Sequence, residues 1–438
     1  MTAEPREVLD LGLEVGCGML ACGASVSSAI RAARHAMRDL GMTDYQADVI
    51  QNTIIVSVRA TPDSDPITAM RVVPVGHQDF LRITHLQRVA AEAASKTIQQ
   101  SRTRVEAILS RPARWGGLDV SLGYGMVSLA AALMLGARMV VAVLALVVAW
   151  CIHRAQVWLA ERRVSVFFQQ CVGGAMAAGA AAIVAIAMGW GVPGLTGINP
   201  SIVVIAAIIP MLAGLAIVGA SEDAISGLYV TSTAHALHGL IVTVGLVLGA
   251  SVVVATTSWL GLPIEMDADF SLRGLYWPAS IAWAGVVGVG WAFCTRASRR
   301  ATVSAGLIGA TGWALYLWFD AQQWPAVAAT GMAALAIGVA SALSSRVLKV
   351  QLDSISTASV VPVLPGLVTW AGVRKLALGS GYTAFLDGQQ DLMTAAAIGF
   401  VLAAGVAAGA ALARPMSVPI RRLPWPRRPL GPRGARKR

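Results

Sequence analysis

Two short segments with a proline and a glycine at matching places are the part of this sequence best suited to chemistry. They read IPMLAGL at 209–215 and VPVLPGL at 361–367, each inside a long apolar stretch. Because proline lacks an N–H group and clashes with the preceding turn, both segments predict a broken helix. The free N–H groups of a half-helix attract an anion. The sequence therefore predicts a binding site for a small polar molecule, with these candidates: Pro210, Gly214, Pro362, Pro365 and Gly366.

Four titratable residues after the first break are candidates for proton transfer, and one of them, Asp223, is also a candidate to bind an ammonium group of the bound molecule. Glu222 and Asp223 have no basic residue near them in the sequence. An ionisable group in hydrocarbon costs about 2.5–3.5 kcal/mol, so it is usually functional or lies at an interface. His235 and His238 are one helical turn apart and share a face, and histidine titrates near physiological pH. The alternatives are a solvated loop for the acids and an interfacial pair without a role for the histidines.

Two polar residues before the second break complete the set of candidates. Asp353 and Ser354 could recognise a hydroxyl group of a bound molecule. The five cysteines form no CxxC pair, and the histidines lack the further ligands that a metal site needs. We therefore expect neither a cofactor nor a metal ion.

Long apolar segments must position these residues. The chain is 56% hydrophobic and 13% charged, with a mean hydropathy of +0.66, which is typical of a polytopic α-helical membrane protein. Each expected span is close to the ~20 residues that a bilayer requires. Only three residues separate the first two, so a re-entrant pair is the alternative there. The ten expected spans are 118–136, 138–153, 167–189, 202–219, 236–256, 276–294, 303–319, 325–343, 356–373 and 392–413.

The charges of the loops predict the orientation. Gaps on one side hold basic residues such as Arg163, Arg299 and Lys349, whereas the opposite gaps hold almost none. The positive-inside rule then places both termini in the cytoplasm of a multi-pass protein of the plasma (inner) membrane. Arg374 and Lys375, after the ninth span, depart from this rule.

The two broken segments also indicate an internal duplication. Aligning them gives an offset near 150 residues, so residues 113–256 and 257–413 each hold five spans. An odd number of spans inverts the second repeat, and substrate then binds near the midplane between the repeats. The alternative is coincidence, since proline and glycine are common in membrane helices, but a matched seven-residue pattern argues against it.

The two ends of the chain differ from the apolar part. Residues 1–112 predict a small cytoplasmic α+β domain with a helix over 9–30, strands over 50–58 and 67–75, and a helix from Asp79 to about Gln100. This domain has no nucleophile or phosphate-loop motif, so we expect no enzyme. Residues 414–438 are rich in Arg and Pro and should be disordered and bind anionic lipid. The net charge of +11 therefore reflects membrane topology, and we expect no nucleic-acid partner.

Several segments resemble the threonine/serine exporter family. The resemblance covers roughly residues 7–412 and is strongest around the two breaks. Two departures occur: Ala213 stands where the second break has Pro365, and His235 and His238 stand where an arginine and a carboxylate are expected. The matching segments are QNTIIVS at 51–57, RVV at 71–73, DFLRI at 79–83, FFQQCVGG at 167–174, LAGLAIVGASEDAISG at 212–227 and VPVLPGL at 361–367.

The resemblance implies ten spans, an N-terminal soluble domain and proton-coupled export of threonine and serine. Substrate, protons and membrane lipids would then be the partners, and a homo-oligomer is compatible with this function. Two other functions stay open: a carrier or channel for another metabolite such as a dicarboxylate, and a membrane-anchored enzyme that uses the N-terminal domain. The spans contain no paired arginines, which makes a dicarboxylate the weaker alternative.

Overall fold

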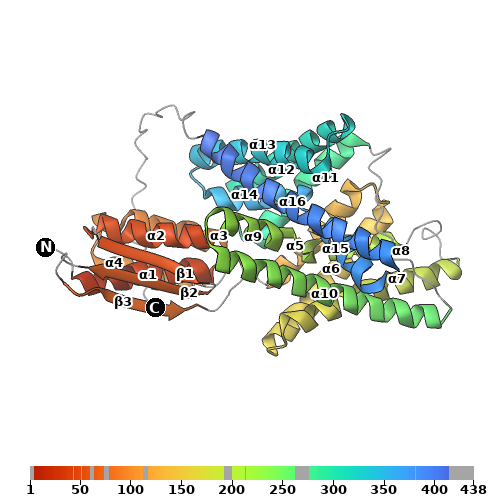
Figure 1. The fold of residues 1–438 in the computed structure, drawn as a ribbon, viewed down its shortest axis with the longest axis horizontal. Coiled ribbons are helices and arrows are strands. Elements are labelled where there is room, and N and C mark those ends of the chain that lie inside the picture. The colour runs from red at the N-terminus through yellow and green to blue at the C-terminus, as the bar shows by residue number, and fades with distance from the viewer. Residues whose placement is uncertain are drawn as a thin grey trace, which may run out of the picture.

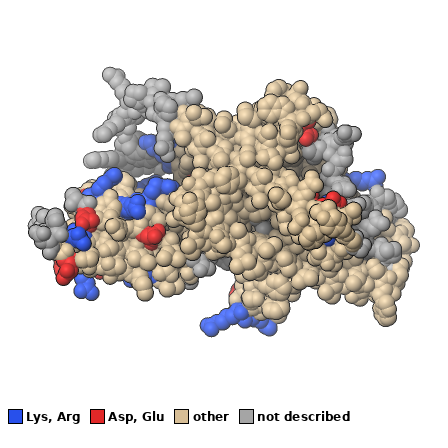
Figure 2. Space-filling model, viewed as in Figure 1, with Lys and Arg blue, Asp and Glu red and all other residues tan. Residues whose placement is uncertain are grey.

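The chain forms an N-terminal module of helices and strands beside a larger helical part (Figure 1). This computed structural model describes residues 4–42, 44–50, 52–59, 64–73, 78–111, 117–191, 200–212, 214–261, 276–379 and 381–413. The predicted lipid-binding tail and Ala213 lie outside the described residues. Figure 2 shows charged side chains gathered over the module, whereas the surface of the helical part is largely uncharged.

The N-terminal module packs four helices and one short 3-10 turn with a three-stranded sheet. The strands are antiparallel in the order β1-β2-β3. β2 alternates buried and half-buried residues, as a strand with one covered face should. The elements are α1 (Pro5–Ala21), α2 (Val26–Asp39), β1 (Asp44–Ile50), β2 (Thr53–Arg59), β3 (Ile67–Val72), α3 (Phe80–Ala91), η1 (Ala93–Ser95) and α4 (Ile98–Ser110).

Three boundaries predicted from the sequence are wrong. The helix over 9–30 is two helices, because Gly23 adopts a left-handed φ of +76° and turns the chain. The strand over 50–58 is a hairpin of β1 and β2, and the prediction missed β1 although its polar and apolar residues alternate from Asp44 to Val49. The helix that starts after Asp79 ends at Ala91. Asp79 does cap it as predicted, accepting a hydrogen bond from the backbone N–H of Arg82 at 3.0 Å.

The helical part contains the apolar helices that the sequence predicts. Among the described residues, eight helical segments are long and apolar enough to cross a membrane, and one of them is Ile202–Ile225, which contains the first break. A ninth is added if the two segments that flank the second break, bent by 52°, form one span. α5 is apolar but shorter, and a turn at Gly136, with a φ of +83°, separates it from α6. The elements of the first half are α5 (Gly117–Met134), α6 (Met139–Glu161), α7 (Val166–Gly189), α8 (Pro200–Ile208), η2 (Ile209–Met211), α9 (Gly214–Ile225) and α10 (Tyr229–Trp259).

The second half repeats these lengths in the same order. α5 and α11 each have 18 residues, α6 and α12 each have 23, and α10 and α16 each have 31. α8 and α14 both have nine residues and are both followed by a three-residue 3-10 turn. The elements are α11 (Trp277–Cys294), α12 (Arg299–Ala321), α13 (Ala326–Leu348), α14 (Leu352–Val360), η3 (Val361–Val363), α15 (Gly366–Leu378) and α16 (Tyr382–Leu412).

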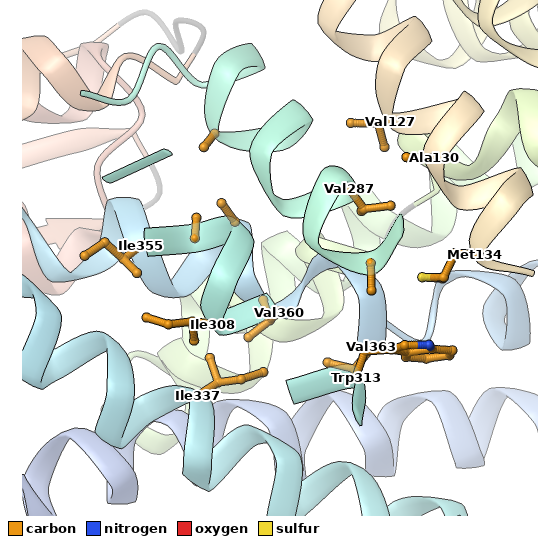
Figure 3. Close-up of a cluster of buried hydrophobic side chains, with 14 of the residues drawn as sticks. Val127, Ala130, Met134, Val287, Ile308, Trp313, Ile337, Ile355, Val360 and Val363 are labelled. Carbon is orange, nitrogen blue, oxygen red and sulfur yellow. The ribbon is translucent and has the colours of Figure 1, made fainter. Parts of the chain in front are cut away.

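A cluster of buried apolar side chains joins the two halves. In Figure 3, Val127 and Met134 of α5 lie near Val287 of α11, and Ile355 and Val363 lie in and directly after α14. α5 therefore packs among helices of the second half, so the halves interlock instead of lying as separate bundles. This arrangement brings the two broken helices together.

Candidate transport site

Both proline segments break their helices, as the sequence predicts. α8 ends at Ile208, and Leu212 has extended backbone with φ −66° and ψ 144°. α14 ends at Val360, and Leu364 has almost the same backbone, with φ −67° and ψ 144°. A new helix begins at Gly214 in the first case and at Gly366 in the second. The first N–H groups of each new helix have no partner within that helix, which makes them candidates to bind a ligand.

The two breaks face each other in a reciprocal way. A Cβ atom built on Gly214 would lie 3.0 Å from Cβ of Leu364 and 3.3 Å from the backbone nitrogen of Gly366. A Cβ atom built on Gly366 would lie 2.9 Å from Cβ of Leu212. Each glycine thus lies against the leucine of the opposite break. Glycine is needed at both positions because any side chain would separate the two backbones.

A pocket opens between the two breaks. Its cavity volume is about 60 Å³, which is smaller than the ~300–1,000 Å³ typical of small-molecule sites, so the two breaks lie close together in this conformation. Its side chains are almost all apolar, so backbone groups and one indole supply its polar contacts. The indole nitrogen of Trp291 is buried and has no hydrogen-bond partner among the described residues. Residues from both breaks that line it include Pro210, Leu212, Gly214, Pro362, Leu364 and Gly366.

An ion pair joins the two helices that follow the first break. Nδ1 of His235, on α10, lies 2.8 Å from Oδ2 of Asp223, on α9. The Asp223 side chain is 8% exposed and that of His235 is 48% exposed, so the acid is buried behind a more accessible base. Such a pair can hold a proton and exchange it with water.

The helices that follow the second break also carry an ion pair, with the acid and the base on the opposite helices. Nζ of Lys375, on α15, lies 2.8 Å from Oδ2 of Asp391, on α16. Here the base is on the shorter helix and the acid on the 31-residue helix. This contact accounts for Lys375, one of the two basic residues that the positive-inside rule did not explain.

Comparisons with known proteins identify the class of site. A model of the threonine/serine exporter family matches residues 10–257, which is more than half of the chain. The chain belongs to the threonine/serine exporter family. A second model of this family matches residues 280–411. The protein is thus a membrane transporter and not an enzyme.

Two curated relatives of the exporter family align with nearly the whole chain. A protein of Mycobacterium tuberculosis (strain ATCC 25618 / H37Rv), named "Probable threonine/serine exporter", is 28% identical over 94% of this chain and 77% of its own length. The "Threonine/serine exporter" of Corynebacterium glutamicum is 26% identical over 95% of this chain and 85% of its own. No solved structure matches.

In this exporter, the residues predicted from the sequence fall into two groups. Pro210, Gly214, Pro362 and Gly366 line the pocket, and Pro365 directly precedes α15. The polar candidates lie outside the pocket lining. Asp223 and His235 form their ion pair, whereas Glu222 and His238 are exposed.

Asp353 and Ser354 lie in the first turn of α14, where the exporter's N-terminal module reaches them. Oδ2 of Asp353 accepts a hydrogen bond from Oγ of Ser28, on α2, at 2.7 Å. Oγ of Ser354 is buried and donates to the carbonyl oxygen of Gln351 at 2.7 Å. Both side chains are thus occupied by contacts within the protein.

Further contacts fix the module against the same end of the helical part, which we call the module-facing end. The backbone N–H of Phe80 donates to the carbonyl oxygen of Thr295 at 3.0 Å. Arg296 lies 3.6 Å from the Asp79 carboxylate, and Leu228 packs against the apolar cluster between α1 and the sheet. These contacts could not be predicted from the sequence, because each partner is an ordinary polar or apolar residue until folding brings the two parts together.

Proposed function

We propose that this protein is a secondary exporter of small amino acids, threonine and serine, coupled to the proton gradient. The observation that carries the proposal is the reciprocal meeting of two broken helices around one pocket. Membership of the exporter family and the names of both relatives support this substrate class.

The chemistry of the pocket suits a small zwitterion. The N–H groups at the starts of α9 and α15 would bind the substrate carboxylate. Carbonyl groups freed at the two breaks would bind the ammonium group. The indole N–H of Trp291 would donate to the substrate hydroxyl, since a buried donor without a partner is costly unless a ligand satisfies it. Among the described residues no lysine or arginine lines the pocket, which disfavours a dicarboxylate.

Alternating access follows from the duplicated arrangement. We propose ten spans in two inverted repeats, with α8 and α9 forming one broken span and α14 and α15 the other. The equal helix lengths in the two halves and the matching backbone angles at Leu212 and Leu364 support this assignment. Tilting one repeat against the other would open the pocket to one side of the membrane at a time. The module-facing end would be cytoplasmic, with both termini on that side.

Proton coupling is assigned to the pair of Asp223 and His235. Asp223 is buried and its partner is accessible, so protonation of this pair would break an attraction between α9 and α10. A change in packing between these helices would move the start of α9, which borders the pocket. Glu222 and His238 flank this pair and remain candidates to pass the proton to water.

The test is transport by the purified full chain in proteoliposomes. Vesicles loaded with unlabelled threonine should take up labelled threonine by exchange, and an imposed pH gradient should drive net accumulation. Serine should compete, whereas succinate should not. If no exchange of threonine or serine occurs, the proposed substrates are wrong, and exchange of succinate would instead favour a dicarboxylate carrier.

A further inference from the structure

A buried histidine in α6 is not used by the site described above. His153 is only 9% exposed, and its Nδ1 lies 2.8 Å from Oγ of Ser121 on α5. The ring of Tyr124 stacks on the imidazole with centroids 4.1 Å apart and planes inclined by 24°. An ionisable side chain at this depth in an apolar bundle is costly and is therefore a candidate for function.

The second half of the chain has a tryptophan in the same place. His153 lies 14 residues after the first residue of α6, and Trp313 lies 14 residues after the first residue of α12. Nε1 of Trp313 donates to Oγ of Ser280 at 2.8 Å, and its ring stacks on Tyr316 at 5.2 Å. In both halves a ring nitrogen thus meets a serine of the preceding helix. Because tryptophan fills this structural role in α12, packing alone does not require a group that can gain a proton.

Aromatic contacts connect His153 to the pocket. Tyr124 lies 6.0 Å, centroid to centroid, from Trp291, whose indole borders the space between the two breaks. A charge gained at His153 would therefore act one aromatic ring away from a residue of the pocket. In a medium of low dielectric constant, the electrostatic interaction of such a charge with polar groups in the pocket is strong over this distance.

The residues around His153 can accommodate both the neutral and the protonated imidazole ring. A hydroxyl such as that of Ser121 can donate to a neutral ring or accept from a charged one. The face of Tyr124 favours a cation stacked on it. The neighbouring helices add few titratable groups: α7 has only Cys171, α8 has none, and Cys294 of α11 approaches Gly123 on α5. Asp119, near the start of α5, is exposed, and α6 itself carries Cys151, Arg154 and Glu161.

We propose that His153 is a proton-binding site of the transport cycle, distinct from the pair of Asp223 and His235. The neutral imidazole takes one proton to become an imidazolium in one conformation of the carrier and releases it in the other. Ser121 then accepts a hydrogen bond from Nδ1, and Tyr124 stacks on the charged ring. This inference rests on the proposed proton-coupled export, whose substrates are tested separately by exchange.

The test replaces His153 with the ring that the other half uses. In proteoliposomes, His153→Trp and His153→Gln should exchange labelled threonine within about twofold of the unmodified chain. Accumulation driven by a pH gradient should fall by about tenfold or more in both variants. Their exchange rates should also lose the pH dependence expected of a histidine between about pH 5 and 8. Tyr316→Phe, in the corresponding tryptophan site, is the matched control and should keep gradient-driven accumulation.

The outcomes separate the two proposals. A role for His153 would be overturned if both variants kept the gradient-driven accumulation and the pH profile of the unmodified chain. Loss of exchange together with accumulation in both variants would also overturn it, because the residue would then serve binding or folding instead of coupling. If the unmodified chain exchanges neither threonine nor serine, the proposed export itself fails.

Discussion

Individual glycines decide how closely the two breaks approach. Gly214 and Gly366 each lie against a leucine of the opposite segment, with no room for a side chain. The sequence predicted both breaks because proline and glycine act locally on the backbone. It could not predict that Gly214 would meet Leu364, or that the Trp291 indole would lie unpartnered beside them, because these contacts form only when distant helices pack.

Filling the contact at Gly366 should stop transport. We expect Gly366→Leu to reduce threonine exchange by at least about tenfold, because overpacking at a close contact forces the backbones apart. Gly219→Leu is the matched control, since a side chain at Gly219, on α9, would meet nothing within 4 Å. Exchange is measured in proteoliposomes after both variants are shown to insert equally. Normal exchange by Gly366→Leu would remove the second break from the binding site.

The thiol of Cys22 in the N-terminal module should be unreactive. Burial, and next the nearby Asp79 carboxylate, raise the pKa of this thiol from 9.0 to about 11. Because the folded state favours the protonated thiol, its contribution to folding stability is present below about pH 9 and is lost as the pH rises toward 11. Labelling of Cys22 by iodoacetamide at pH 7.5 should therefore be slow until denaturant is added. Rapid labelling of the folded protein would contradict this placement.

At the scale of elements, matching helices occupy matching places in the two halves. The lengths of α5 to α10 recur to within one residue in α11 to α16, which supports the duplication that two seven-residue segments predicted. Its boundaries were less accurate: α10 begins at Tyr229 and α16 at Tyr382, earlier than predicted. Both helices start with polar turns that carry ion-pair partners, so a rule based on apolar runs misses their first residues.

The contact between α9 and α10 should govern the pH response. We expect Asp223→Asn to alter the pH dependence of threonine exchange between about pH 5 and 8, because His235 loses its carboxylate partner. Asp387→Asn, at an exposed position of α16, is the control and should leave the profile unchanged. Exchange rates are measured across this range at equal pH on both sides. An unaltered profile in Asp223→Asn would mean that this pair is structural.

At the scale of the whole molecule, the module and the helical part form one connected structure. Asp79 caps α3 and also lies 3.6 Å from Arg296, so one carboxylate serves both parts. Ser28 adds a hydrogen bond to Asp353 at the start of the second broken helix. A composition change near residue 112 was enough to predict two parts, but their docking depends on contacts that composition does not encode.

Removing one docking contact should loosen the module. We expect Arg296→Ala to speed hydrogen exchange at the Phe80 amide, which donates to the carbonyl of Thr295. A loss of about 1–3 kcal/mol corresponds to roughly fivefold to 150-fold faster exchange. Arg300→Ala, at an exposed position in the first turn of α12, is the control and should leave this amide protected. Equal protection in both variants would show that the Asp79 contact does not hold the module.

The central claim is that a small amino acid binds between the two breaks, and substrate protection at Leu364 tests it most directly. Leu364 borders the pocket and lies two residues before the start of the second half-helix, α15. In a cysteine-free background that still exchanges threonine, a Leu364→Cys variant should react with a small thiol reagent, and threonine should slow that reaction while succinate should not. If the variant exchanges threonine but threonine does not slow the labelling of the new cysteine, the substrate binds elsewhere and the central claim is wrong.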